Sequence, residues 1–250
     1  MSERDRWDRL AATQPYWSVL IDDRNRADRF DDAARLAFFK SGETEIAATL
    51  STARTVAGGA TRPERALDFG CGVARLTIPL ASEFDAVVAV DISENMLAEA
   101  RDNCARASVN NVTFRLTDEL LSSEVSRDFD FIHSFIVFQH IPPREGLRIP
   151  DGLLSRLRVG GIGALHFTYA RRASQLRRVV NRLRRRIRAV DVVVKLLRGE
   201  PLDEPTIPMY EYDLRQIRAL LQQHGCRELT VEQTDHGGHL GAMLFFRMEA

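Results

Sequence analysis

Five short runs of apolar and β-branched residues alternate with helix-length segments between Arg65 and Thr168, and this alternation constrains the fold more than any other feature. The runs are Arg65–Phe69, Ala86–Val90, Val112–Arg115, Phe129–Phe135 and Ile162–Phe167. Most are almost continuously apolar, which is typical of parallel strands covered by helices on both faces. We therefore expect an α/β fold with a doubly wound, mostly parallel sheet.

The end of the chain returns to the same pattern. Helix-length segments at Ala74–Phe84 and Glu94–Arg106 separate the first strands, and a further helix is expected over Asp213–His224. The helix before the fifth run is expected to end at Leu157, because Gly160 and Gly161 follow it. Strand-like runs at Glu228–Gln233 and Ala242–Met248 follow it. Added to the five earlier runs, these two predict a seven-stranded sheet of the Rossmann-like kind.

The segments around this alternating part suggest how the chain is divided. Residues 61–168 are the expected core, and residues 213–250 complete its sheet. Residues 1–60 have a helical pattern and many aromatic side chains, which either pack on the core or form a lid over a ligand. Residues 169–212 are expected to be a basic, helical insertion after the fifth strand.

Charge is balanced over the whole chain but not along it. The 35 basic and 35 acidic side chains argue against a general affinity for polyanions. Residues 171–198, however, contain ten Arg and one Lys against one Asp, with apolar residues at helical spacing. Such a helix suits an anionic membrane, an acidic partner or an anionic substrate, and a solvated cap or a homodimer contact is the alternative.

Neither export nor metal binding is indicated. No apolar run approaches the roughly 18 residues of a transmembrane helix, and the first residues lack the apolar core of a secretory signal. Cys71, Cys104 and Cys226 do not have metal-ligand spacing, so we expect reduced thiols and no metal. These features favour a soluble, cytoplasmic protein.

The first strand runs into a glycine turn, which is the first candidate ligand site. Gly70 and Gly72 allow the backbone to approach a ligand closely. Arg75 stands where a dinucleotide fingerprint needs Gly or Ala, and no Walker A Lys follows, so the turn does not fit NAD, FAD or a P-loop nucleotide. The acid Asp68, ahead of the glycines, suits a ligand with an ammonium group.

Two more acids follow the next two strands. Asp91 lies 21 positions after Gly70, close to the spacing at which an acid meets ribose hydroxyls in such sheets. Thr117 and Asp118 follow the third strand. Because the carboxyl ends of parallel strands form one rim, where open α/β sheets bind ligands, these acids predict a shared site for a ligand with an unphosphorylated ribose.

Together these residues resemble the class I S-adenosylmethionine-dependent methyltransferases. Five segments carry the resemblance. Ala66–Gly72 is similar to the first family motif, Val90–Asp91 to the second, and Thr117–Asp118 to the adenine-contacting site. Phe129–His140 is similar to the fourth-strand motif beside the methyl group, and Leu157–Gly163 to the segment leading into strand five. Ala74 departs from the family, which often has a third glycine there. The resemblance implies S-adenosyl-L-methionine as cofactor. The cofactor-binding residues that it implies are Asp68, Gly70, Gly72, Asp91, Ile92, Asp118 and Phe135.

Candidate residues for the acceptor side lie later in the chain. His140 follows the fourth strand and is the candidate general base for an alcohol acceptor, with structural packing as the alternative. Tyr210 and Tyr212 are expected to line the acceptor site. His236 stands in a Gly-rich turn that either faces the substrate or is an ordinary hairpin connection.

The preferred acceptor is a hydroxyl on a sugar, glycolipid or secondary metabolite. The segments Phe38–Gly42 and Pro208–Tyr212 resemble bacterial methyltransferases of glycan, glycolipid and natural-product biosynthesis. We therefore expect a small-molecule or glycan acceptor and no nucleic acid. A nucleic-acid methyltransferase, or a non-catalytic cofactor-binding protein acting through residues 171–198, is the alternative.

Overall fold

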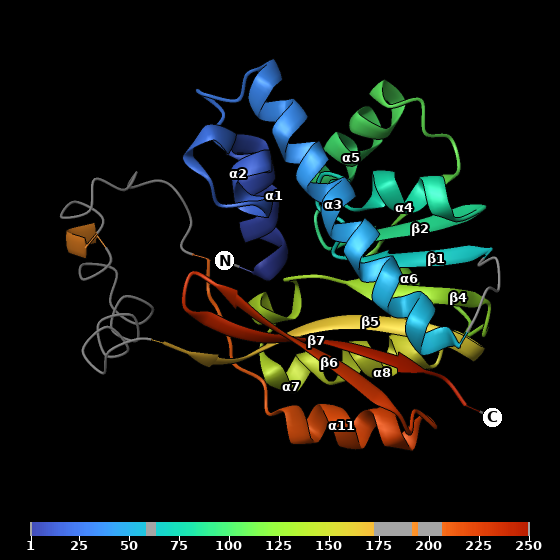
Figure 1. Cartoon of the computed structure of the whole chain (residues 1–250). Coiled ribbons are helices and arrows are strands. Elements are labelled where there is room, and N and C mark those ends of the chain that lie inside the picture. Colours follow the sequence, from blue (N-terminus) through green and yellow to red (C-terminus); the bar gives the residue numbers. More distant parts are fainter. Residues whose placement is uncertain (1, 59–63, 173–191, 195–206, 250) are drawn as a thin grey trace.

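The computed structural model describes residues 2–58, 64–172, 192–194 and 207–249. Its sheet has seven strands in the order β3-β2-β1-β4-β5-β7-β6 (Figure 1). The strands are β1 (Arg65–Phe69), β2 (Ala86–Asp91), β3 (Val112–Leu116), β4 (Phe129–Ser134), β5 (Leu157–Arg171), β6 (Leu229–His236) and β7 (His239–Arg247). Strands β1 to β5 pair in parallel, and β7 runs antiparallel to both β5 and β6. The predicted doubly wound, mostly parallel sheet is confirmed.

Helices cover both faces of this sheet (Figure 1). One face carries α3 (Asp32–Ala57), α4 (Thr77–Glu83) and α5 (Glu94–Arg106), and the other carries α6 (Thr117–Ser122), α8 (Arg148–Leu154) and α11 (Leu214–Gln223). Neighbouring strand residues point to opposite faces, as the period of a strand requires. Ala66 packs with Ile46 of α3, whereas Leu67 packs with Leu153 of α8.

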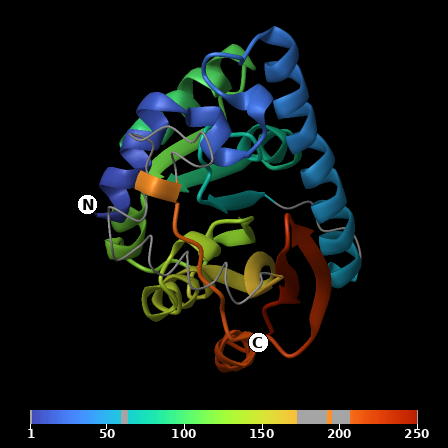
Figure 2. The ribbon, with the colours of Figure 1, turned by 90° about the vertical axis from the view of Figure 1, so that its left-hand side faces the viewer.

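Two N-terminal helices lie over the carboxyl edge of the sheet (Figure 2). The short elements on this side are α1 (Glu3–Thr13), α2 (Pro15–Val19), η1 (Asp23–Asn25), η2 (Phe138–His140) and α7 (Pro143–Gly146). Ser93 Oγ donates to Asp8 Oδ1 of α1 at 2.6 Å, and Arg4 forms an ion pair with Asp118. Tyr16 of α2 donates from its hydroxyl to Glu99 of α5. Both helices are therefore tied to the rim where the predicted ligand site lies.

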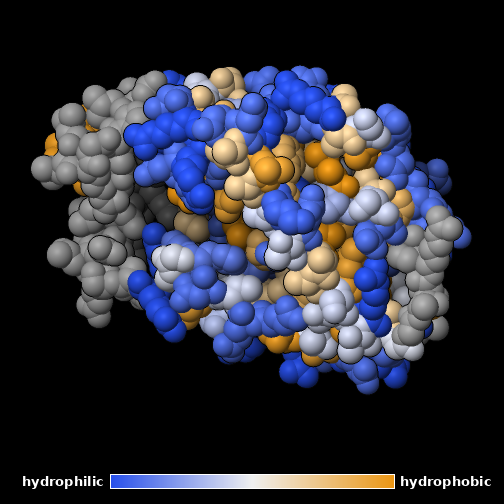
Figure 3. Space-filling view, turned by 45° about the horizontal axis from the view of Figure 1, so that its top comes forward, coloured by the Kyte–Doolittle hydropathy of each residue, from blue (hydrophilic) through white to orange (hydrophobic). Residues whose placement is uncertain are grey.

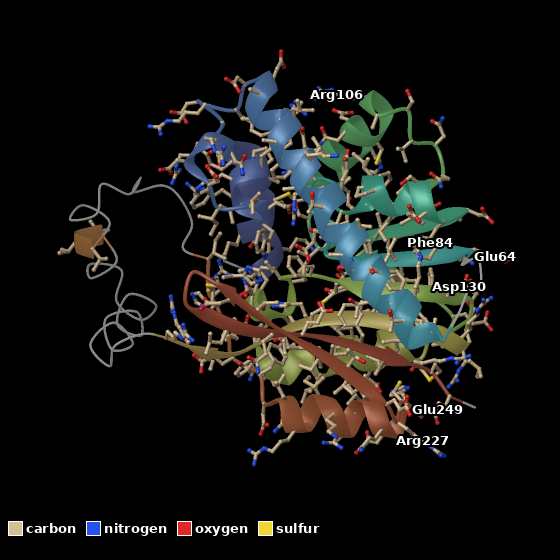
Figure 4. The ribbon with its side chains drawn as sticks, viewed as in Figure 1. Glu64, Phe84, Arg106, Asp130, Arg227 and Glu249 are labelled. Carbon is tan, nitrogen blue, oxygen red and sulfur yellow. The ribbon has the colours of Figure 1, made fainter. Side chains whose placement is uncertain are left out.

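The opposite edge of the sheet is fixed by one buried carboxylate. Asp130 Oδ2 accepts hydrogen bonds from the backbone N–H groups of Glu64 and Arg65, at 2.9 and 2.7 Å. Figure 4 shows Asp130 and Glu64 close together at this end, away from α1 and α2. This contact anchors the start of β1, so the glycine turn at its other end begins from a fixed strand.

Three predicted boundaries were wrong. Helix α4 begins at Thr77, not at Ala74, because Ala74 has a φ of 68° and cannot be helical. Strand β5 begins at Leu157, not at Ile162, because a register shift opposite Phe129 lets it pair early. The predicted helix end at Leu157 is likewise wrong, because α8 already ends at Leu154.

The last two strands are longer than predicted and meet in a two-residue turn. Gly237 and Gly238 have φ values of 62° and 85°, which suits a tight hairpin turn. The Gly-rich segment is thus a hairpin connection that also brings His236 and His239 opposite each other. Most of the basic segment 171–198 lies outside the described residues. Among the helices that are described, none is long and apolar enough to cross a membrane.

Candidate functional site

A cavity of about 1250 Å³ opens at the carboxyl ends of β1, β2 and β4. The predicted site residues that line it are Asp68, Gly70, Gly72, Asp91, Ile92, Asp118, Phe135, His140 and His236. Its other walls come from α1, the loop after α2 and the β6–β7 turn. The space-filling view shows hydrophobic side chains in recesses among hydrophilic ones on the face turned toward the viewer (Figure 3). The structure thus brings together residues that lie far apart in the sequence.

The glycine turn needs its glycines for its own packing. Gly70 and Gly72 have φ values of 77° and 53°, where other residues are strained. A Cβ on Gly70 would lie 2.2 Å from Val137, and one on Gly72 would lie 2.8 Å from Val19. The turn is therefore held tightly against the loop after β4 and the end of α2, which both border the cavity.

Asp68 is a buried carboxylate at the floor of this turn. It is 2% exposed. Its Oδ2 accepts a hydrogen bond from Thr77 Oγ1 at 2.7 Å, and its Oδ1 lies 2.9 Å from His133 Nδ1. These two partners fix its orientation, so it presents negative charge to the cavity without reorganisation.

Asp91 is a second buried carboxylate, at the end of β2. It accepts backbone hydrogen bonds from Gly72 at 2.9 Å and from Ser93 at 3.0 Å. Burial raises its pKa to about 6, against the opposing effect of these hydrogen bonds. Each carboxylate oxygen can accept a further bond, so the residue fits a ribose with two hydroxyl donors. Asp118, by contrast, is exposed and paired with Arg4.

His140 has a partner on each ring nitrogen. Nδ1 lies 3.1 Å from the Pro208 carbonyl, which only accepts, so Nδ1 carries the proton. Nε2 lies 3.2 Å from the side-chain amide of Gln139, whose oxygen already accepts from Thr168. Burial lowers the pKa of His140 to about 4. The ring is therefore neutral at pH 7, and its lone pair is already engaged.

His236 has the opposite arrangement. Its Nε2 is buried and finds no hydrogen-bond partner in the described chain. The ring packs edge-on against Phe135, with centroids 5.6 Å apart, and lines the cavity. Burial lowers its pKa below the ordinary histidine value, so at neutral pH the unprotonated ring nitrogen can accept a proton.

The two predicted tyrosines do not line the cavity. Tyr212 is 3% exposed, packs in the core against Phe167, and donates its hydroxyl to the Ile141 carbonyl at 2.8 Å. Its backbone N–H donates to the Thr168 carbonyl, and that of Tyr210 donates to the Gln139 carbonyl. The expected contact between Tyr212 and the substrate does not fit this burial. Ile207 and Met209 of the same segment line the cavity instead.

Arg75 is a site residue that the sequence reasoning missed. It is 7% exposed, lines the cavity beside the glycine turn, and donates from Nη1 to Ser41 Oγ at 3.1 Å. In the sequence it counted only as a mismatch to a dinucleotide motif. The sequence feature that could have identified Arg75 is a long, positively charged side chain directly after the glycine turn.

The thiols and potential metal ligands offer no other chemistry. All three cysteines are buried, and burial raises the pKa of each thiol, so none is a ready thiolate. Within the described ranges, no group of three or more His, Cys, Asp or Glu side chains is placed to hold a metal ion. The arrangement instead suits binding and alignment of a nucleoside ligand.

Comparison with known proteins supports this interpretation of the edge. Residues 66–161 match the family model described as a methyltransferase domain. Magnesium protoporphyrin IX methyltransferase from Synechocystis PCC 6803, solved with bound SAH, has a TM-score of 0.63 at 22% identity, covering 98% of both chains. The N-methyltransferase NodS from Bradyrhizobium japonicum WM9 has a TM-score of 0.58 at 14% identity over both whole chains. At these sequence identities, the structural similarity shows only that the fold is shared.

Curated relatives match only a part of this chain. A tRNA/tmRNA (uracil-C(5))-methyltransferase from Campylobacter curvus is 36% identical over 94 residues, which are 34% of this chain and 26% of the relative. A 23S rRNA (uracil(1939)-C(5))-methyltransferase from Shewanella sediminis is 38% identical over 65 residues, covering 26% and 14%. The chain thus spans about a quarter of the first relative's length. The names of both relatives specify RNA as the substrate, so the expectation that excluded a nucleic acid is contradicted by this similarity.

The strand order, the acids along one rim and the family match define a class of protein. The chain has the fold of the class I S-adenosylmethionine-dependent methyltransferases, and the resemblance seen in the sequence is confirmed. Its residues 66–161 match the methyltransferase-domain family model, which covers less than half of the chain.

Proposed function

We propose that this chain transfers the methyl group of S-adenosylmethionine to a hydroxyl of a small molecule. The observation that carries the proposal is that one cavity is lined both by the rim acids Asp68 and Asp91 and by apolar side chains of α1, α2 and the segment at Ile207. Trp7, Trp17 and Met209 contribute to its wall. Enclosure of this kind excludes water and aligns two reactants, and alignment can supply roughly 7–11 kcal/mol.

In this proposal, different residues of the rim bind different parts of the cofactor. Asp91 binds the ribose hydroxyls, the Gly70 turn with Asp68 holds the methionine end, and Asp118 with Ile92 borders the adenine. When bound, the cofactor supplies a methyl group on a positively charged sulfur. The protein then has to place the acceptor oxygen in line with that group and to remove its proton.

His236 is the better-placed proton acceptor. His140, the residue favoured from the sequence, would have to give up its bond from the Gln139 amide before it could take a proton. His236 packs against Phe135, at the end of β4, and its Nε2 is unpaired within the described chain. We therefore assign the base to His236 and a positioning role to His140, through the Pro208 carbonyl.

An RNA acceptor is the second candidate function. The observation that favours it is the partial similarity of this chain to the two RNA uracil methyltransferases. The buried cysteines mean that either reaction would proceed without a thiolate nucleophile from this chain. Direct transfer to a hydroxyl is the simpler chemistry, so the small-molecule acceptor is preferred.

The test has two stages. Calorimetric titration with S-adenosylmethionine, S-adenosylhomocysteine and NAD establishes the ligand; adenosyl binding without NAD binding is expected. Transfer of a labelled methyl group is then compared between a set of hydroxylated metabolites and unmodified RNA transcripts. Label in the metabolites supports the proposal, label in RNA alone selects the second candidate, and absence of adenosyl binding overturns both.

A further inference from the structure

The rim of the cavity holds a buried cation that lacks a counterion. The Arg75 side chain is 7% exposed. Its Nη1 donates to the Ser41 hydroxyl, and its Nε is buried without a hydrogen-bond partner. Among the residues that the structure describes, no carboxylate forms an ion pair with Arg75; Glu45 and Asp68 raise its pKa only from a greater distance, and burial lowers it.

This position is imposed by packing. Helix α3 crosses the turn so closely that a Cβ on Gly42 would lie 2.2 Å from the Arg75 carbonyl oxygen. Ser41, the preceding residue of α3, supplies the hydroxyl that Arg75 contacts. A guanidinium removed from water costs several kcal/mol unless an anion and further hydrogen bonds compensate. The fold thus keeps a cation at the cavity wall that no described carboxylate contacts directly, although Glu45 and Asp68 line the same cavity.

We propose that Arg75 binds the carboxylate of the methionine part of the cofactor. The inference rests on the proposed function, because it needs S-adenosylmethionine as the ligand. Arg75 belongs to the same turn as Gly70 and Gly72, and Asp68 supplies the negative charge for the neighbouring ammonium group. A planar guanidinium can hold a carboxylate through two parallel hydrogen bonds, and Nε, now unpaired, would be one of the donors.

Two ligands that differ only in the carboxylate test the proposal. S-adenosylhomocysteine carries it, and decarboxylated S-adenosylhomocysteine does not. Wild-type protein should bind the first roughly 10- to 100-fold more tightly, as a charge-assisted contact implies. In Arg75→Met this preference should disappear through weaker binding of S-adenosylhomocysteine, with the decarboxylated ligand unaffected. Arg75→Lys should recover part of the preference.

Arg106→Gln is the matched control, because Arg106 is an exposed cation in the last turn of α5 and is not among the cavity-lining residues. It should leave both affinities unchanged. If Arg75→Met fails to fold, Arg75→Lys and Ser41→Ala are used instead. Each should lower the affinity for S-adenosylhomocysteine and leave that for the decarboxylated ligand unchanged.

If the Arg75 variants bind both ligands more weakly by the same factor, the role of Arg75 is structural and the inference is overturned. A carboxylate preference that survives Arg75→Met would also overturn it, because another group of the protein would then bind the carboxylate. Failure of the wild-type protein to bind either adenosyl ligand is a different result, because it removes the proposed function itself.

Discussion

The two sides of the cavity are built differently. On the cofactor side, Asp68 and Asp91 come from adjacent parallel strands, and each carboxylate is held by two hydrogen bonds. On the acceptor side, the wall combines α1, η2, the β6–β7 turn and the Ile207 segment, and His236 has an unpaired nitrogen. The cofactor side is preorganised by the sheet, whereas the acceptor side is assembled from segments that are distant in sequence.

The largest expected effect separates chemistry from cofactor binding. His236→Ala should lower kcat by about 10²–10⁴, the usual contribution of a general base, and leave the affinity for S-adenosylhomocysteine unchanged. In the wild type, kcat should fall on the acid side as His236 becomes protonated. Single-turnover kinetics and calorimetry measure the two quantities.

The matched control for that variant is His140→Ala. Loss of the Pro208 contact should lower the melting temperature and raise KM, with a smaller loss of kcat. If His140→Ala abolishes kcat and His236→Ala does not, the base is His140 and the assignment must be reversed.

A substitution on the cofactor side should instead lower the affinity for the cofactor. Asp91→Ala should weaken S-adenosylhomocysteine binding by at least roughly 100-fold, because it removes two charge-assisted hydrogen bonds of the kind worth about 1.5–3 kcal/mol each. Asp102→Ala, an exposed acid on α5, is the control and should bind normally. Unchanged binding in Asp91→Ala, measured by calorimetry, would remove Asp91 from the site.

Acid should act on the cofactor side through the same carboxylate. With a pKa of about 6 for Asp91, affinity for S-adenosylhomocysteine should fall about tenfold between pH 7 and pH 5, where the carboxylate becomes protonated. Because this pKa is higher than in the unfolded chain, acid favours the folded, ligand-free protein in that window. The loss of affinity is therefore not unfolding. A flat pH profile in the wild type would contradict this prediction.

The smallest effect concerns the junction of the two sides. Arg4→Gln frees Asp118 from an exposed ion pair, which is worth roughly 0.2–1 kcal/mol. Association of S-adenosylhomocysteine should become about two- to fivefold faster in stopped-flow measurements, because Arg4 no longer competes for Asp118. Arg9→Gln, an exposed cation on the same helix, should have no effect. A similar change in both variants would indicate general electrostatics.

The same contrast explains what the sequence could predict. The acids of the cofactor side follow strands in order, so apolar runs and spacing were enough to find Asp68 and Asp91. The acceptor side depends on tertiary contacts: the burial of Tyr212 and the free nitrogen of His236 follow from how β6, β7 and the Ile207 segment pack. Arg75 was missed because its lack of a counterion is visible only in three dimensions.

The insertion after β5 is held at both ends beside the acceptor space. The Arg172 N–H donates to the Gly238 carbonyl, and the Pro208 carbonyl accepts from His140. Both anchors lie at the acceptor space and away from β1 and β2, which carry Asp68 and Asp91. Exchanging the segment between them for that of a related protein is therefore expected to change acceptor preference while S-adenosylhomocysteine binding stays unchanged.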